Sequence, residues 1–150
     1  MALKYLANGN LEPGIYELSW EEFVEEYGYT YPRKFIISGL KVALHALKLC
    51  NCQKVYIDGS FTTKQDKPHD WDGCFDPEGI DEKRLENDYP VFGDLDHPRL
   101  QQKMLFKGEI FPSTTHANAE GETYFEWFQK DKKDDSPKGI ILILLKNFNV

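Results

Sequence analysis

The 150-residue sequence has the length of one domain, and its 41% hydrophobic and 14% aromatic residues are typical of a chain that folds. The formal net charge of −7 disfavours a protein that binds nucleic acid through its phosphate backbone without regard to sequence, so we expect no non-specific DNA binding. A small nucleotide remains compatible with this charge, because a metal ion or a local cation can reverse the field within one pocket.

The cysteines and the apolar runs indicate in which cell compartment the protein is expected. The three cysteines, Cys50, Cys52 and Cys74, do not form the dense, even-numbered pattern of a disulfide-stabilised secreted domain. The chain does not begin with a charged segment followed by an apolar run, and its longest apolar stretch, residues 140–145, is far too short to span a bilayer. We therefore expect a single domain over residues 1–150, cytoplasmic and without membrane contact.

The first third of the chain predicts one extended segment and two helices. Residues 11–16 (LEPGIY) indicate a turn that leads into a short extended segment. Ser19 and Glu22 have the spacing of a capping box, which predicts a short helix through about Tyr27. Pro32 suits the start of a second helix, because its missing N–H costs nothing there. From residue 33 to 50 an apolar stripe at helical spacing predicts one buried face: Ile36, Leu40, Ala43, Leu44 and Leu47.

Strands are predicted mainly in the rest of the chain. Residues 55–57 are a β-prone run that ends at Gly59, and residues 70–75 and 104–111 are two further candidate strands. Residues 76–99 are acidic and irregular, with one short helix expected near 81–87 and another after Pro98. A helix is expected over 123–130 and a buried strand over 140–145. This order of elements predicts an α/β fold with a mixed β-sheet and helices packed on it.

Two short motifs carry the chemical information. In the first, Gly59 and Ser60 follow the end of a strand, where glycine lets the backbone come close to a ligand and serine adds a hydroxyl and an amide donor. In the second, Asp70 and Asp72 are two apart on a candidate strand, so both carboxylates point to one face about 6–7 Å apart. Like charges on one face repel unless a cation lies between them, and Mg²⁺ prefers carboxylate and phosphate oxygens. The acidic pair alone is a weak signal, but after a strand and Gly-Ser it indicates a metal site.

The string Gly59-Ser60-Phe61, a short loop and Asp70-Trp71-Asp72 resembles the Gly-Ser…Asp-x-Asp signature of the DNA polymerase beta-like nucleotidyltransferase superfamily. The resemblance extends over most of the chain, because residues 11–16, 20–23 (WEEF), 125–129 (FEWFQ) and 137–140 (PKGI) are similar to a family of small bacterial and phage nucleotidyltransferase-like proteins. The superfamily implies a nucleotidyltransferase-type mixed sheet. It also implies transfer of a nucleoside monophosphate from a nucleoside triphosphate to a hydroxyl.

The same resemblance implies roles for the motif residues. Asp70 and Asp72 would be catalytic residues that hold Mg²⁺ or Mn²⁺, and Gly59 and Ser60 would hold the terminal phosphates. The superfamily often has a third carboxylate on a later strand, for which Glu109 is the candidate here, although Asp is more usual at that position.

Other residues are open to two readings. Lys64 and Lys67 lie in the loop between the two motifs, where a cation could meet phosphate, and Arg33 could do so from its helix start. Loop lysines are more often simply solvated, and a phosphate contact is the less common role for all three residues. Gly73 departs from the superfamily pattern, in which a bulky aliphatic residue follows the second Asp.

Two functions from different classes follow. The first is an Mg²⁺-dependent nucleotidyltransferase-like protein that modifies a protein side chain or an RNA end, in a toxin–antitoxin or phage-defence setting with a cognate partner protein; that setting rests on analogy alone. The second is a catalytically inactive interaction module that keeps the fold. An enzyme should bring Asp70, Asp72 and a third carboxylate together in an open cleft, whereas a module would show that cleft filled or Glu109 pointing elsewhere.

Overall fold

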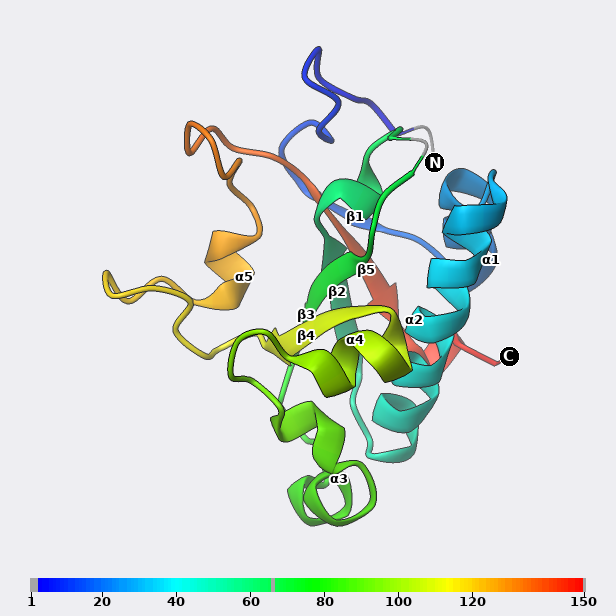
Figure 1. Ribbon diagram of the computed structural model, residues 1–150, viewed down its shortest axis with the longest axis vertical. Helices are drawn as coiled ribbons and strands as arrows, with labels where there is room; N and C mark the ends of the chain where they lie inside the picture. Colours follow the sequence, from blue (N-terminus) through cyan, green and yellow to red (C-terminus); the bar gives the residue numbers. More distant parts are fainter. Residues whose placement is uncertain (1–2, 66, 150) are drawn as a thin grey trace.

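Five strands form one mixed β-sheet in the computed structural model, which describes residues 3–65 and 67–149 (Figure 1). They are β1 (Ile15–Glu17), β2 (Lys54–Asp58), β3 (Trp71–Phe75), β4 (Gly108–Pro112) and β5 (Ile140–Leu144). Their order in the sheet is β1-β5-β2-β3-β4. The pairs β1–β5 and β3–β4 are parallel, and β2 is antiparallel to both β5 and β3. The predicted α/β fold with a mixed sheet is confirmed.

The α-helices other than α4 begin directly after a residue whose side chain caps them. They are α1 (Trp20–Tyr27), α2 (Tyr31–Leu49), α3 (Glu82–Asp88), α4 (Leu100–Phe106) and α5 (Tyr124–Trp127), with 3₁₀ turns η1 (Ser60–Thr62), η2 (Pro90–Gly93) and η3 (Leu145–Asn147). The capping box predicted for α1 is present: the Glu22 amide donates to Ser19 Oγ at 3.1 Å, and the Ser19 amide donates to Glu22 Oε1 at 2.9 Å. The Thr30 hydroxyl caps α2, and all residues of the predicted apolar stripe are buried.

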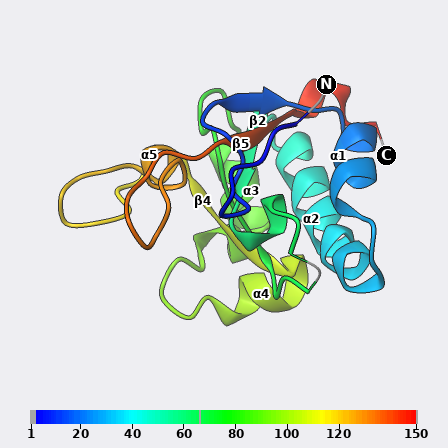
Figure 2. The ribbon, with the colours of Figure 1, turned by 90° about the horizontal axis from the view of Figure 1, so that it is seen from above.

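The two faces of the sheet are covered unequally. In Figure 2, α1, α2 and α4 lie on one side of the sheet and α5 lies on the other. Successive residues of a strand point to opposite faces, so Trp71 and Phe75 of β3 enter the larger core while Cys74 joins a small cluster on the other side. Asp72 shares the face of Cys74, and the thinner cover on that side leaves room for a cleft.

Two predicted elements need correction. The strand expected over 104–111 begins only at Gly108, because residues 104–106 are the end of α4, which Lys107 terminates in a left-handed conformation (φ 60°). The helix expected over 123–130 is limited to α5, since Lys130 leaves it to form a bridge with Pro137. The extended segment after residue 11 is a true strand, β1, at the edge of the sheet.

Within residues 3–65 and 67–149, no helix has both the length and the apolar character needed to cross a membrane.

Candidate functional site

Strand pairing brings the predicted carboxylates together at the same end of the neighbouring strands β3 and β4. Asp72 in β3 is paired with Asp58 of β2 on one side and with Glu109 of β4 on the other. Residues directly opposite each other in a sheet share a face, so these side chains project together. Asp70 lies just before β3, two residues from Asp72. The structure thus brings Asp70, Asp72 and Glu109 together, each with a potential ligand atom within 4.8 Å of the others.

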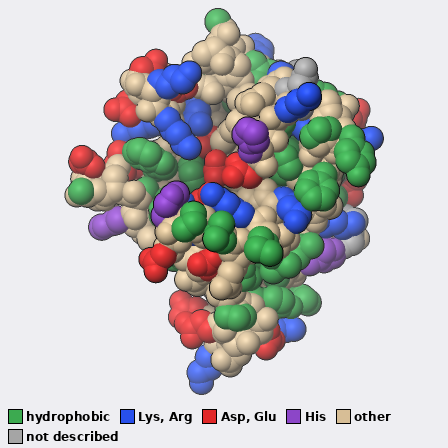
Figure 3. Space-filling model, viewed as in Figure 1, with side chains coloured by type: hydrophobic (Ala, Val, Ile, Leu, Met, Phe, Trp, Pro, Cys, Tyr) green, Lys and Arg blue, Asp and Glu red, His purple; other side chains and the backbone are tan. Residues whose placement is uncertain are grey.

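The acidic cluster borders a cleft of about 580 Å³. Figure 3 shows acidic side chains in the middle of this face, with lysine and arginine side chains around them. Besides Asp70 and Asp72, three stretches of the chain contribute to the cleft: residues 8–10, residues within 59–65, and residues within 131–138. Pockets for small ligands commonly measure about 300–1,000 Å³, so a nucleotide is an appropriate size for this cleft.

Gly59 turns the chain directly against Asp72. Its backbone has φ 87° and ψ −166°, a conformation that is essentially restricted to glycine. A Cβ atom at this position would lie 2.6 Å from Asp72 Oδ2. Ser60 follows as the first residue of η1 and lines the cleft. The Gly-Ser pair predicted to hold phosphate therefore lies beside the predicted metal ligand.

Arg33 organises the loop that follows Gly59 and Ser60. Its side chain is fully buried and donates hydrogen bonds to backbone carbonyls, including Phe61 O at 2.8 Å, Thr63 O at 2.7 Å and Gln65 O at 2.5 Å. The guanidinium also lies 4.9 Å from the centroid of the Phe61 ring. A phosphate contact, which the sequence left open for Arg33, is not what the structure shows; the residue positions the loop instead.

The two loop lysines differ in their surroundings. Lys64 lines the cleft, but its ammonium lies 2.6 Å from Glu26 Oε1 and 5.3 Å from the ring centroids of both Tyr5 and Tyr29. Lys67 is exposed and is not among the residues that line the cleft. Neither lysine is therefore held toward the acidic cluster.

Three further lysine side chains line the cleft, and the sequence alone did not identify them. Lys132, Lys133 and Lys138 line it from the segment before β5. Lys138 is buried, with Nζ 3.2 Å from Asp58 Oδ1. A signal existed: Lys138 lies two residues before β5, which is antiparallel to β2, so its position is next to the end of β2. Recognising it requires the strand order, which no local pattern provides.

The cluster is electrostatically strained. Burial, followed by the neighbouring charge of Asp70, raises the pKa of Asp72 to about 7. Burial and then the charge of Glu109 also raise the pKa of Asp70. Burial raises the pKa of Asp58 to about 6, although Lys138 acts in the opposite direction. A bound divalent cation would relieve this repulsion, because it lowers the energy of all the ionised carboxylates at once.

Glu109 already has two cationic partners. Its Oε2 lies 2.5 Å from Arg99 Nε, and its Oε1 lies 3.1 Å from Lys103 Nζ. Glu109 has a carboxylate oxygen near those of the two aspartates, as expected for an enzyme. A metal ion bound there would compete with Arg99 and Lys103 for the Glu109 carboxylate.

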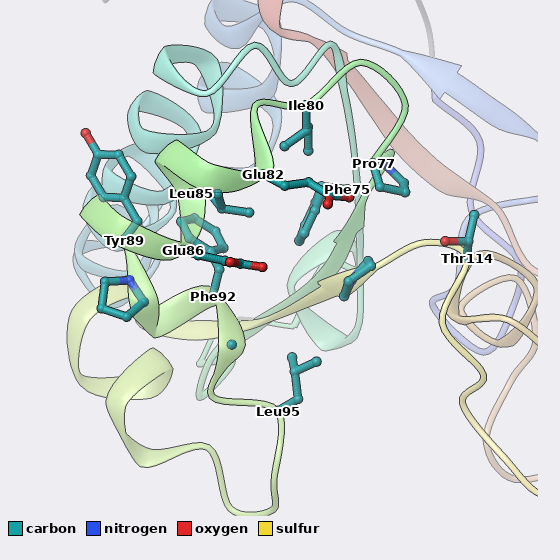
Figure 4. A pocket seen from close by; sticks show the side chains of 13 residues that line it. Phe75, Pro77, Ile80, Glu82, Leu85, Glu86, Tyr89, Phe92, Leu95 and Thr114 are labelled. Carbon is teal, nitrogen blue, oxygen red and sulfur yellow. The ribbon is translucent and has the colours of Figure 1, made fainter.

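A second cavity, of about 600 Å³, lies between α3, η2 and the ends of β3 and β4 (Figure 4). Its walls are mainly apolar, with Phe75, Leu85 and Phe92 among them, and Glu82 and Glu86 are its charged residues. No lysine or arginine occurs among the described residues that line it, so it does not suit a triphosphate.

The fold and the site define an α/β protein with a three-carboxylate cluster at one edge of a mixed sheet, beside a lysine-lined cleft. Residues 3–144 match a family of unknown function (DUF6932), and the chain belongs to that family. No curated protein and no solved structure is significantly similar to it.

Proposed function

We propose that the protein is a nucleotidyltransferase-like enzyme that binds a nucleoside triphosphate with Mg²⁺ or Mn²⁺ and transfers a nucleoside monophosphate to a protein or RNA hydroxyl. The observation that supports it is the convergence of Asp70, Asp72 and Glu109 within 4.8 Å, with Asp70 and Asp72 lining a cleft that Gly59 and Ser60 also line. The resemblance to the nucleotidyltransferase superfamily rests on the same residues.

The donor set fits a hard divalent cation. Three carboxylates offer only oxygen ligands, and Mg²⁺ favours carboxylates together with substrate phosphates. Burial, and then the charge of Asp70, raises the pKa of Asp72 to about 7, and a bound cation would favour its ionised form. When bound, such an ion would polarise the phosphoryl group and neutralise charge on the departing pyrophosphate.

The residues around the cluster would have different roles in the proposed transfer. Gly59 and Ser60 would hold the terminal phosphates, and Lys132 and Lys133, which line the same cleft, would add positive charge. In the transfer, the acceptor oxygen forms a bond to the α-phosphorus as the bond to the bridging oxygen breaks and pyrophosphate leaves. Glu109 would position the acceptor hydroxyl, whose proton passes to a carboxylate or to water.

A thermal-shift panel tests the proposal. The four nucleoside triphosphates are each added with and without Mg²⁺ or Mn²⁺ to the wild type and to Asp70→Asn and Asp72→Asn. One site at a ligand concentration 100 times Kd stabilises the fold by about 2.7 kcal/mol, a shift of several degrees. We expect a metal-dependent shift with at least one nucleotide, lost in both variants. Asp88→Asn is the matched control, because it makes the same change on an exposed position of α3. The same shifts in all variants would contradict the proposal.

The inactive interaction module remains a second candidate, and the ion pairs of Glu109 with Arg99 and Lys103 favour it. An α-labelled nucleotide separates the two: the enzyme transfers label to protein or RNA in a lysate, whereas the module binds nucleotide, or none, without transfer. A cytoplasmic toxin–antitoxin or phage-defence setting belongs to the proposal on analogy alone.

A further inference from the structure

An exposed apolar seam runs along the solvent side of α2. Phe35, Val42 and Leu49 are seven residues apart and 52%, 44% and 53% exposed, and Tyr31 at the start of the helix is 82% exposed. The seam consists of Tyr31, Phe35, Ser38, Val42, His45 and Leu49, all of them exposed. Ser38 and His45 are its polar members, and the His45 ring packs edge-on against Phe148. Their spacing alternates between four and three residues, which places them on one stripe with the 3.5-residue period of helix–helix packing.

The seam continues onto α4. The two helices cross closely, because a Cβ atom at Gly39 would lie only 2.2 Å from Phe106 O. On α4, Met104 and Leu105 are 74% and 49% exposed. Lys107 joins the two helices, with Nζ 5.2 Å from the Phe35 ring centroid and 2.7 Å from Met104 O. Figure 3 shows hydrophobic side chains gathered over α2 and α4 on this face. An apolar surface of this kind marks an interaction site more often than an isolated exposed residue does.

The other flank of the seam is basic. Lys34, Lys41 and Lys48 are also seven residues apart, and each directly precedes a large apolar residue of the seam. Lys48 donates hydrogen bonds to Phe148 O and Asn149 Oδ1, so Lys34 and Lys41 are the two that a partner would meet. The sequence of α2 contains no aspartate or glutamate, although the whole chain carries a formal charge of −7. At the position beside the seam of a helix pair, such charges select the partner and its orientation.

We propose that this face binds an amphipathic helix of another protein, with apolar residues at 3.5-residue spacing and Asp or Glu on the flank that meets Lys34 and Lys41. A second copy of the chain fits less well. In an antiparallel pair of α2 helices the lysine columns would face each other. In a parallel pair they would face the other flank of the seam, which holds Pro32 and the buried Gly39 and Ala46. Neither arrangement supplies acidic partners. This proposal does not depend on the proposed catalytic activity.

A displayed library of amphipathic helices about three heptads long tests it. The apolar positions are fixed, and Glu or Lys is placed at random on the flanks. We expect selection on the wild-type protein to enrich Glu-flanked helices, and binding of those helices to weaken at high salt. Val42→Glu should lower their affinity at least about tenfold. Ile15→Glu, at an equally exposed position on β1, is the matched control and should have no effect.

A charge swap makes the test specific. The double variant Lys34→Glu/Lys41→Glu should lose Glu-flanked helices and gain Lys-flanked ones, whereas Lys83→Glu on the exposed side of α3 should do neither. The variants' circular dichroism and melting temperature verify that they fold. Enrichment of Lys-flanked helices on the wild type, no enrichment at all, or a dimer of the protein alone that Val42→Glu dissolves would overturn the proposal.

Discussion

Lys138 and Asp58 form a buried ion pair, with Nζ 3.2 Å from Oδ1, that links the segment before β5 to the end of β2. Asp58 Oδ1 has no hydrogen bond of its own among the described residues, so the lysine charge is its main compensation. Even so, burial raises the pKa of Asp58 to about 6. The pair therefore holds Lys138 at the cleft, although burial of the Asp58 carboxylate costs free energy.

We expect Lys138→Met to lower the free energy of unfolding by about 3–5 kcal/mol at pH 8, because it leaves a buried carboxylate uncompensated. The loss should be smaller at pH 5, where Asp58 is protonated in the folded variant. Asp58→Asn in the same chain should restore much of the stability. Urea unfolding at both pH values measures this. Lys130→Met, which breaks a more exposed ion pair with Glu122, is the control, and an equal loss in both would contradict the prediction.

Local pattern predicts part of this site. The alternation of β3 places Asp70 and Asp72 on one face, and this follows from the sequence because a strand has a period of two. The stripe of α2 is likewise local. The contribution of Lys138 depends on the strand order, since it requires β5 to lie beside β2. Buried Arg33 also escapes prediction, because its acceptors are carbonyls about 30 residues away in the chain.

Two glycines of the sheet, Gly73, which departs from the superfamily pattern, and Gly108 in β4, have structural explanations. A Cβ atom at Gly73 would lie 2.5 Å from Tyr56 O, so the bulky residue expected after the second Asp does not fit. Gly108, which weakens β4 as a strand, lies where a Cβ atom would be 2.5 Å from the indole nitrogen of Trp71. Both glycines therefore accommodate a close neighbour, Tyr56 or Trp71, on the adjacent strand.

Gly59→Ala should destabilise the protein and weaken nucleotide binding. The strained backbone alone costs about 1–3 kcal/mol, and the new Cβ atom, 2.6 Å from Asp72 Oδ2, must displace that carboxylate. Urea unfolding and the thermal shift with Mg²⁺ and nucleotide are the measurements. Gly93→Ala is the control, because open space surrounds its Cβ position. Equal stability of the two variants would show that the turn at residue 59 tolerates a side chain.

Arg99→Gln should strengthen metal binding. Arg99 Nε lies 2.5 Å from Glu109 Oε2, so its removal takes away a positive charge that competes with the cation for this carboxylate. We expect Mn²⁺ to bind roughly threefold to tenfold more tightly, as measured by calorimetric titration of the protein alone. Arg84→Gln on α3 carries the same change of charge far from the cluster and should leave the affinity unchanged. Weaker Mn²⁺ binding in Arg99→Gln would mean that the arginine orients Glu109 for the metal instead of competing with it.

Asp72→Asn should stabilise the metal-free protein in a pH-dependent way. Burial and the charge of Asp70 raise the pKa of Asp72 from 3.8 to about 7 in the folded state, so the folded wild type binds more protons than the unfolded chain between these values. Its stability therefore falls as pH rises from about 4 to 7, and the variant lacks this contribution to the slope.

At pH 8 the variant should exceed the wild type by at least about 1 kcal/mol, and the difference should shrink toward pH 5. Urea unfolding in the presence of a chelator measures both. In saturating Mg²⁺ the wild type should become the more stable of the two proteins. The ion stabilises the wild type alone, because the asparagine side chain is a poorer ligand for a hard cation. Asp88→Asn, at an exposed position, should show neither effect. A stability difference that does not vary with pH would show that folding does not raise the pKa of Asp72, and one physical argument for a metal at this site would be lost.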